Sequence, residues 1–560
     1  MTIYRSILAV LLVTAAGRTQ GPQAGPVTPD QQPETQALAT AARNLSRNTT
    51  ASDEIKAQAE KLIGDAETLQ TGGQNGEMRR KLANAITLLN GRPWDQKAEL
   101  AWSLALRVDN QVADSSLPLI ARVSQFYAVP FKPVHGLQLR ATLVLPATEK
   151  TGDPVVRQAG AFPIAAMNFA SEPFGFDANL EGAADGAYTL KTELMDGDEL
   201  IATLERPLQV IHGIVSDRAN IERRLARIQA HDSTKASIRY PYILATTVNT
   251  GRRHLNQADF GIPFDPHPVP YDFTQAVHYS AGLLKALESG KDPLWQAKGD
   301  HARHYWFEET HETMPYRVYV PQRWDGRSKL PMVLVLHGST RDENFYFDRD
   351  GGILAKQAEQ HGYLVVCPLG FRPSADWGSA QMASGNPVAA GQDGRGAAGR
   401  GNPGAAGRGG RGVGGQGNSA RMQENEWSEK DALNVLELVR KEYPIDASRI
   451  YLFGHSRGGA GAWFLAQKYP EWWAAMANSA AGIGSNGYQS VPYERLKGLP
   501  FMIAVGDQDP ALNATRLSVK LAREHGLDPV YMEVPGATHE TIVAIEEPQV
   551  FDFFDKHRRQ

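Results

Sequence analysis

The second half of the chain alternates short apolar runs with amphipathic stretches, and this alternation restricts the fold more than any other feature. The apolar runs are PYRVYVP, KLPMVLVLHG, YLVVCPLG, RIYLFGHS, PFMIAVGD and PVYMEVPG, and helical patterns follow most of them. Strands with almost no polar residues are buried on both faces, and parallel strands need crossover connections, usually helices. Residues 301–560 are therefore predicted to form an α/β domain with a mostly parallel sheet covered by helices on both sides.

The chain before this domain shows three further patterns. Residues 37–125 space apolar side chains three and four apart, which predicts a helical region. Residues 127–215 alternate polar and apolar side chains around turn signals, which predicts a β-rich accessory domain resembling a β-sandwich. Residues 216–300 return to a helical pattern. A Gly-, Ala- and Arg-rich tract at 384–420 interrupts the later domain, and we expect a disordered insertion there because it buries too little apolar surface to fold.

The N-terminus has the composition of an export signal. Arg5 precedes an apolar stretch from Ile7 to Ala16, and small side chains at its end suit cleavage. The stretch is shorter than the ~20 residues that span a membrane. Residues 1–17 therefore predict a signal peptide, with a buried N-terminal helix as the alternative, and residues 18–36 predict a disordered leader. We expect a secreted or periplasmic protein without a membrane span; the oligomeric state is not readable from the sequence.

The charge balance argues against a polyanion as the partner. The chain has 58 Lys and Arg, 62 Asp and Glu, and a formal net charge of -4. A dedicated nucleic-acid binder would carry a strong basic excess. The tract at 384–420 resembles an RNA-binding segment, but its arginines are few and no aromatic residue is interleaved for stacking on bases. We therefore expect no nucleic-acid partner.

The sequence indicates no metal or cofactor. The single cysteine, Cys367, excludes an internal disulfide and a Cys-based zinc site, and its apolar surroundings predict a buried core thiol. His301 and His304 are three residues apart and could pair on a helix as metal ligands. No carboxylate partner is evident, so a solvated helix face is the favoured interpretation.

A short motif carries the chemistry. Gly454-His455-Ser456-Arg457-Gly458 lies between an apolar run, RIYLF, and a helical stretch, GGAGAWFLAQKY. A serine on a tight strand-to-helix turn projects its hydroxyl, and the residues two before and two after it must be small because neighbouring backbone passes close by. The following helix start also directs backbone N–H groups at the site. Ser456 is thus the predicted nucleophile.

A serine hydroxyl needs a base that takes its proton, and the base needs an acid that orients it. His539 follows a late apolar run in PVYMEVPGATHE and is the predicted base. Asp507 and Asp509 both follow the preceding run, PFMIAVGDQDP. Asp509 is the preferred acid because it lies further into the loop, where it can turn toward His539, and Asp507 is the alternative.

The developing negative charge on a substrate oxygen needs fixed donors. The backbone N–H of Arg457, directly after the nucleophile, is one predicted donor. The second is the N–H of Ser339, in the loop after PMVLVLHG, where Gly338 allows close approach and His337 is a structural turn residue. Trp377 and Trp427 are further candidates to line the pocket.

Taken in order, these motifs resemble secreted esterases related to polyhydroxybutyrate depolymerases and feruloyl or acetylxylan esterases, and also prolyl-oligopeptidase-like catalytic domains. The resemblance covers about residues 305–560 without the Gly-rich tract. It implies an α/β-hydrolase fold, a cofactor-free acyl-serine mechanism with Ser456, Asp509 and His539, and a small or polymer-linked ester as substrate. The sequence departs from many relatives at Arg457, where they carry Met, which changes the pocket polarity.

Two alternatives stay open at this point. A peptidase of the prolyl-oligopeptidase type would usually carry a β-propeller before the catalytic domain, and residues 37–300 show no repeat of that kind. A non-catalytic binding protein on a hydrolase scaffold is the other alternative, since a fold alone does not establish an activity.

Overall fold

The chain forms two compact units, which we describe separately. The computed structural model describes residues 32–69, 74–108, 112–147, 152–165, 169, 172–246, 272–339, 341–371, 376–379, 415–481 and 493–559. The first unit comprises Met1–Arg227 and Pro241–Ser280, and the second comprises Ile228–Tyr240 and Ala281–Gln560. The predicted signal peptide, residues 1–17, lies outside the described residues, as does most of the predicted leader.

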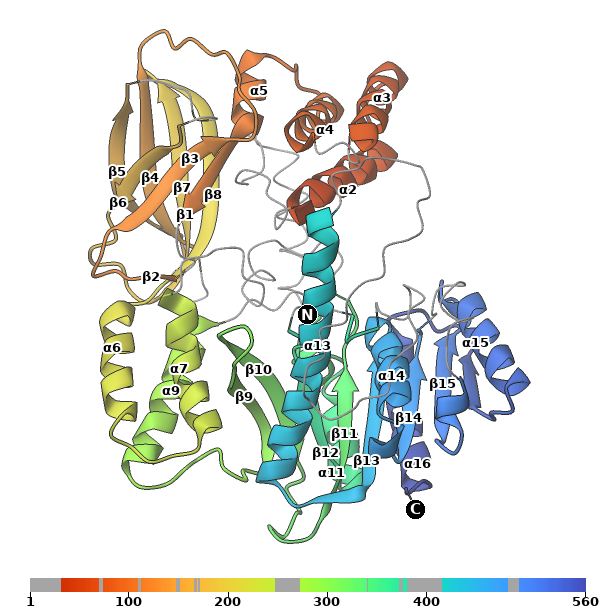
Figure 1. The fold of residues 1–560 in the computed structure, drawn as a ribbon. Helices are drawn as coiled ribbons and strands as arrows, with labels where there is room; N and C mark the ends of the chain where they lie inside the picture. The colour runs from red at the N-terminus through yellow and green to blue at the C-terminus, as the bar shows by residue number, and fades with distance from the viewer. Residues whose placement is uncertain are drawn as a thin grey trace. The chain divides into compact units, whose positions relative to one another are not determined.

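The first unit begins with a group of helices. These are α2 (Gln32–Asn48), α3 (Asp53–Leu69), α4 (Asn75–Leu89) and α5 (Gln96–Ser103) (Figure 1). Helices α2 to α4 pack through apolar side chains such as Leu38, Ile63 and Leu82. Because α2 begins at Gln32, the last residues of the predicted leader are helical, which corrects that boundary.

Two packed sheets follow the helices. The strands are β1 (Leu104–Val108), β2 (Val112–Ala113), β3 (Leu119–Gln125), β4 (Leu137–Leu145), β5 (Val155–Ile164), β6 (Phe174–Ala178), β7 (Gly186–Asp196) and β8 (Glu199–Val210). One sheet has the order β1-β3-β6 and the other the order β2-β8-β7-β4-β5. Both sheets contribute to one apolar core, which includes Leu106, Val123 and Leu190. This is the β-sandwich-like region expected from the sequence.

The predicted helical region 37–125 is wrong from Leu104 onward, where β1 to β3 replace it. Short apolar runs such as LALRV fit a buried strand as well as a helical face, so spacing alone could not separate the two. After the sandwich come α6 (Ile214–Leu225), α7 (Asp232–Thr246) and α9 (Phe273–Glu288). The helical pattern expected for residues 216–300 ends before Gly299, where the next strand begins.

The second unit contains one large sheet. Its strands are β9 (Gly299–Phe307), β10 (Glu312–Val320), β11 (Leu330–Leu336), β12 (Leu364–Pro368), β13 (Ile445–His455), β14 (Ala475–Ser479), β15 (Phe501–Gly506) and β16 (Val530–Val534). The order is β16-β15-β14-β13-β11-β12-β10-β9. Strands β11 to β16 pair in parallel, while β9 and β10 are antiparallel additions at one edge. Their apolar sequences match strands buried on both faces.

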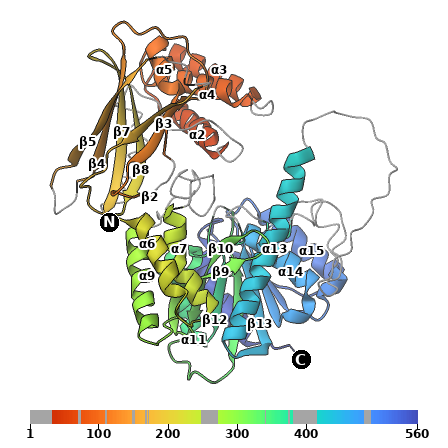
Figure 2. The ribbon, with the colours of Figure 1, turned by 60° about the vertical axis from the view of Figure 1, so that its left-hand side comes forward.

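Helices cover both faces of this sheet (Figures 1 and 2). They are α10 (Phe345–Asp348), α11 (Ile353–His361), α13 (Gly415–Glu442), α14 (Arg457–Lys468), α15 (Leu512–Glu524) and α16 (Ile542–Asp555), with 3₁₀ turns η3 (Pro470–Trp472) and η5 (Tyr493–Leu496). Leu334 of β11 belongs to the core under α13 and α14, whereas Val333 belongs to the core under α11 and α16. This layered parallel sheet, with a serine at the β13–α14 turn, is the α/β-hydrolase fold that the sequence predicted.

Three local predictions can be compared with the structure. The tract at 384–420 lies outside the described residues except at its end, where α13 begins at Gly415, so that end is helical and not disordered. His301 and His304 lie on β9, which corrects the helix expected there. Cys367 is buried, as predicted. Among the described residues, no helix is long and apolar enough to cross a membrane.

Candidate active site

Ser456 occupies a strained turn between β13 and α14. Its backbone angles are φ 57° and ψ -120°, a region that side-chain-bearing residues rarely adopt. The Ser456 N–H donates to the carbonyl of Ser479 at 2.8 Å, and the Ser456 carbonyl accepts from Ala460 N–H at 3.1 Å. These bonds to β14 and α14 hold the turn in place and present the side chain at the carboxyl edge of the sheet.

The small residues around Ser456 are required by contact distances. A Cβ on Gly454 would lie 2.1 Å from the carbonyl oxygen of Gly458, and a Cβ on Gly458 would lie 1.9 Å from that of Leu336. Both neighbours are backbone atoms, which cannot move aside as a flexible side chain could. The predicted steric reason for the glycines is therefore present in the structure.

Ser456, His539 and Asp509 form a continuous hydrogen-bonded chain. The Nε2 atom of His539 lies 2.9 Å from the Ser456 Oγ, and its Nδ1 atom lies 2.9 Å from Asp509 Oδ2. The Asp509 side chain is fully buried, while that of His539 is about one-third exposed. The three residues follow β13, β15 and β16, whose carboxyl ends meet at one edge of the sheet.

The structure separates the two candidate acids. The other carboxylate oxygen of Asp509, Oδ1, accepts from Ala511 N–H at 2.7 Å, so the loop backbone fixes this side chain. Asp507 instead accepts from Gly536 N–H at 2.7 Å, in the loop that carries His539. Asp509 is thus the carboxylate that contacts the imidazole, and Asp507 supports the loop.

The surroundings of His539 change the pKa of its imidazole. The hydrogen bond that His539 donates to the Asp509 carboxylate raises the pKa of His539 above its ordinary value, although burial opposes this. The ring of His455 lies 4.8 Å from that of His539. Burial lowers the pKa of His455 well below its usual range, so this second histidine stays neutral beside the base.

The segments that carry the predicted oxyanion donors both flank Ser456. A Cβ on Gly338 would lie 3.1 Å from the Ser456 Cβ, so the loop after β11, which continues to Ser339, passes beside the nucleophile. His337 is buried; it bonds the carbonyl of Leu369 through Nε2 at 2.8 Å, and burial lowers its pKa to about 4. His337 is therefore the structural residue that the sequence indicated. Arg457 begins α14 directly after Ser456.

The side chain of Arg457 has a partner that sequence patterns did not reveal. Its Nη1 atom lies 2.5 Å from Asp376 Oδ1, and the Arg457 side chain is 41% exposed. The backbone beside Asp376 is held by α13, because Trp377 N–H donates to Ser428 Oγ and Gly378 N–H donates to Asn425 Oδ1. The residue directly after the nucleophile thus carries an ion pair.

The two candidate pocket tryptophans pack in the core. Trp377 is fully buried, its Nε1 donates to the carbonyl of His337 at 3.1 Å, and its ring lies 4.9 Å from that of His337. Trp427 is partly buried and contacts Phe371, with ring centroids 5.0 Å apart. Trp377 therefore packs against His337 and stabilises the loop after β11.

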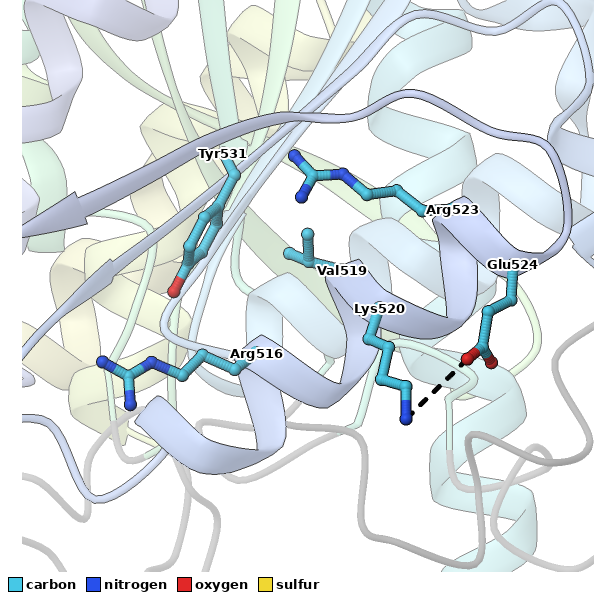
Figure 3. A pocket seen from close by; sticks show the side chains of 6 residues that line it. All are labelled: Arg516, Val519, Lys520, Arg523, Glu524 and Tyr531. Atoms are coloured by element: carbon cyan, nitrogen blue, oxygen red, sulfur yellow. Dashed lines mark ion pairs between the residues drawn. The ribbon is translucent and has the colours of Figure 1, made fainter.

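Within the described ranges, no group of three or more His, Cys, Asp or Glu side chains is placed to hold a metal ion. His301 bonds the carbonyl of Lys298 at 2.8 Å, and His304 lies 3.2 Å from Ser237 Oγ. A shallow, open hollow of about 540 Å³ lies elsewhere, between α15 and β16 (Figure 3). Its lining contains none of Ser456, Asp509 and His539.

Comparison with known proteins gives a low overall similarity. No protein-family model matches the sequence, and no curated protein matches it. Similar solved structures include S-formylglutathione hydrolase from Staphylococcus aureus, at 15% identity over 46% of this chain and 98% of that chain, with a TM-score of 0.33. A ferulic acid esterase from Anaeromyces mucronatus has 15% identity over 46% and 92%, with a TM-score of 0.32. A thermostable esterase has 16% identity over 82% and 100%, with a TM-score of 0.34.

Proposed function

We propose that the protein is a serine hydrolase that cleaves carboxylic esters through an acyl-serine intermediate. The observation that carries this proposal is the chain of two 2.9 Å contacts from Ser456 through His539 to Asp509. This arrangement supplies a nucleophile, a base and an orienting acid in the geometry that acyl transfer requires. The low structural similarity to known esterases adds no weight, so the proposal rests on the side chains.

The residues have defined roles in this reaction. The Ser456 Oγ attacks the ester carbonyl carbon while His539 Nε2 accepts its proton, and Asp509 stabilises the resulting imidazolium. The backbone N–H groups of Ser339 and Arg457 are the proposed donors to the oxyanion. The bond to the alcohol then breaks, and the alcohol leaves with the proton from His539. A water molecule then attacks the acyl carbon and gives a proton to His539. The bond between the acyl carbon and Ser456 Oγ breaks, His539 returns the proton to Oγ, and the acid leaves.

Esters are preferred to peptides as the substrate class. The described part of the first unit contains helices and two packed sheets, and no radially arranged four-stranded blades are present there. The propeller that a prolyl-oligopeptidase-like enzyme usually carries is thus unsupported among the described residues. Export is also part of the proposal, and it rests on the sequence of residues 1–17.

The test replaces the nucleophile. Purified mature chain and its Ser456→Ala variant are assayed with p-nitrophenyl acetate and butyrate, a matched amide, and a fluorophosphonate probe. We expect wild type to cleave the esters and to be labelled, and the variant to lose activity by about 10⁴-fold or more. Ser518→Ala is the matched control, because Ser518 is buried in α15 and donates only to Ala514 within its own helix. Full activity in Ser456→Ala would end the proposal.

A further inference from the structure

Glu540, the residue after His539, is held by two arginines from the other side of the site. The carboxylate of Glu540 lies 3.4 Å from Arg341 Nη2 and 3.3 Å from Arg349 Nη1. Arg349 also donates from Nη2 to the backbone carbonyl of Glu540 at 2.9 Å. The second contact fixes main chain, so Arg349 restrains the path of the loop and not only a side chain.

The two arginines belong to the segment that follows β11. Arg341 N–H donates to the carbonyl of Gly338, which lies beside Ser456. Both guanidinium groups lie over the ring of Phe345, at 5.1 Å for Arg341 and 4.7 Å for Arg349. Their side chains are 9% and 20% exposed. Partial burial and stacking restrict these side chains, so their contacts to Glu540 are better ordered than those of an ordinary surface pair.

The other end of the His539 loop is fixed separately. Gly536 N–H donates to Asp507 Oδ1 at 2.7 Å, and Gln508 N–H donates to the carbonyl of Ala537 at 3.0 Å. These bonds attach residues before His539 to the loop after β15. Around His539, Thr538 and Thr541 bond each other within the same segment, and α16 enters the apolar core from Ile542 onward. Glu540 lies between these two supports.

We propose that Glu540, Arg341 and Arg349 are positioning residues that tie the His539 loop to the loop after β11 and so keep the imidazole within reach of Ser456. This inference rests on the proposed function, because it concerns the same site. None of the three is a catalytic residue; they act through His539. A displacement of about 1 Å in such a group can reduce the rate by about a hundredfold, which is why a loop restraint matters.

The charges around His539 make the proposal distinguishable from simple structural support. Asp509 approaches from the loop after β15, His455 from β13, Glu540 from its own loop and Arg341 from the loop after β11. The buried Glu546 of α16 lies near Asp509. Glu540 raises the pKa of His539 and Arg341 lowers it. Removing one or the other should therefore shift the titration in opposite directions.

The experiment combines a titration with kinetics on the full chain. Histidine-labelled protein is titrated by NMR, with His539 assigned by comparison with His539→Gln. Glu540→Gln should lower the pKa of His539 and Arg341→Gln should raise it. Arg516→Gln is the matched control, because Arg516 forms a comparable pair with Glu533 on α15 and β16, remote from the triad.

The kinetic part tests positioning directly. Arg349→Met should reduce kcat for p-nitrophenyl acetate by about tenfold with little change in KM, and Arg349→Lys should recover part of the loss. Circular dichroism verifies folding, and the lysine variant replaces the methionine variant if the latter unfolds. An unchanged kcat in a folded Arg349 variant, or pKa shifts of equal sign in the two charge variants, overturns the proposal. Opposite pKa shifts in Glu540→Gln and Arg341→Gln, together with no ester cleavage by wild type, would defeat the proposed function and still support the tie between the loops.

Discussion

The two large sheets of this protein show how strand connection decides where chemistry can gather. In the second unit, β11 is buried at every position, because helical crossovers cover both faces of the parallel sheet. In the first unit, β7 alternates buried and half-buried residues from Tyr188 to Glu193, as expected for an antiparallel sheet with one face toward its core. Hairpins send successive loops to opposite ends, whereas parallel strands bring their carboxyl ends to one edge. Ser456, Asp509 and His539 follow three different strands and meet at that edge.

Two buried carboxyl groups, one in each unit, have different surroundings. In the first unit, Asp114 accepts bonds from the N–H groups of Ser116, Gly213 and Val215 at 2.9 to 3.0 Å. In the second unit, one carboxyl oxygen of Glu547 is buried without a hydrogen-bond partner among the described residues. A paired carboxylate stabilises a loop in its charged form, while an unpaired one is held neutral. Asp114 therefore stabilises its loop as a carboxylate, whereas a charge on Glu547 opposes folding.

The largest expected effect separates catalysis from stability. Asp509→Asn should reduce kcat by about 10⁴-fold with little change in melting temperature, because the imidazole loses its orienting acid. Asp114→Asn should lower the melting temperature and leave kcat unchanged, because its partners are structural. The pair is measured by ester kinetics and calorimetry. A strong loss of kcat in Asp114→Asn would break the separation between the units.

The next effect compares two glycine positions. Gly458→Ala should destabilise the second unit by about 3 kcal/mol or more, since its Cβ would lie 1.9 Å from the Leu336 carbonyl oxygen. Gly175→Ala in β6 should change stability by less than about 1 kcal/mol, because nothing lies within 4 Å of its Cβ. Denaturant unfolding measures both. If both substitutions lowered the free energy of unfolding equally, the backbone around Gly458 would have to move to accommodate the added Cβ, which would contradict this prediction.

The smallest expected effect is on the pH dependence of stability. The free energy of unfolding should change with pH in opposite directions for Glu547 and for Asp114. Burial raises the pKa of Glu547 to about 8, so the folded state retains a proton that the unfolded chain releases near pH 4.5. Stability should fall as pH rises between these values, so Glu547→Gln should gain stability over wild type progressively from pH 4.5 to pH 8 and differ little from it at pH 4.5.

For Asp114, stability should change with pH in the opposite direction. Burial alone would raise its pKa, but hydrogen bonds from Ser116, Val215 and Gly213 outweigh burial and hold the pKa below 3.8. Its contribution is present above that value and is lost as pH falls through the folded pKa. Melting curves of wild type, Glu547→Gln and Asp114→Asn from pH 3 to 9 would measure both pH dependences. A Glu547→Gln gain that does not grow with pH would contradict this account.

Sequence patterns predicted the fold of the second unit because its strands are almost purely apolar and its turn motif has a steric cause. They also brought Ser456 and His539 into one site by order along the chain. They favoured Asp509 over Asp507 from its place further into the loop and kept Asp507 as the alternative, because both follow the same strand and only the direction of each carboxylate separates them. The structure shows that both serve the His539 loop, one through the imidazole and the other through Gly536.

The features that the sequence did not reveal depend on distant partners. Strand β9 was missed because Arg303, a charged residue, is fully buried there; its partner, Glu442, is 139 positions away. Arg349 and Glu540 are 191 positions apart, and no local period connects them. Strands β1 and β3 were read as helix because their apolar runs are too short to show which period they follow.

The backbone of Ser456 has a practical consequence for anyone who wants an inert form of this protein. Glycine accepts a positive φ without steric conflict, so Ser456→Gly should relieve a backbone strain on the order of 1 kcal/mol that serine and alanine both retain. The most durable inactive version is then the one lacking the whole side chain, and it would be the better starting point for crystals with an intact ester bound. The backbone conformation that presents the Ser456 hydroxyl therefore lowers the stability of the folded protein.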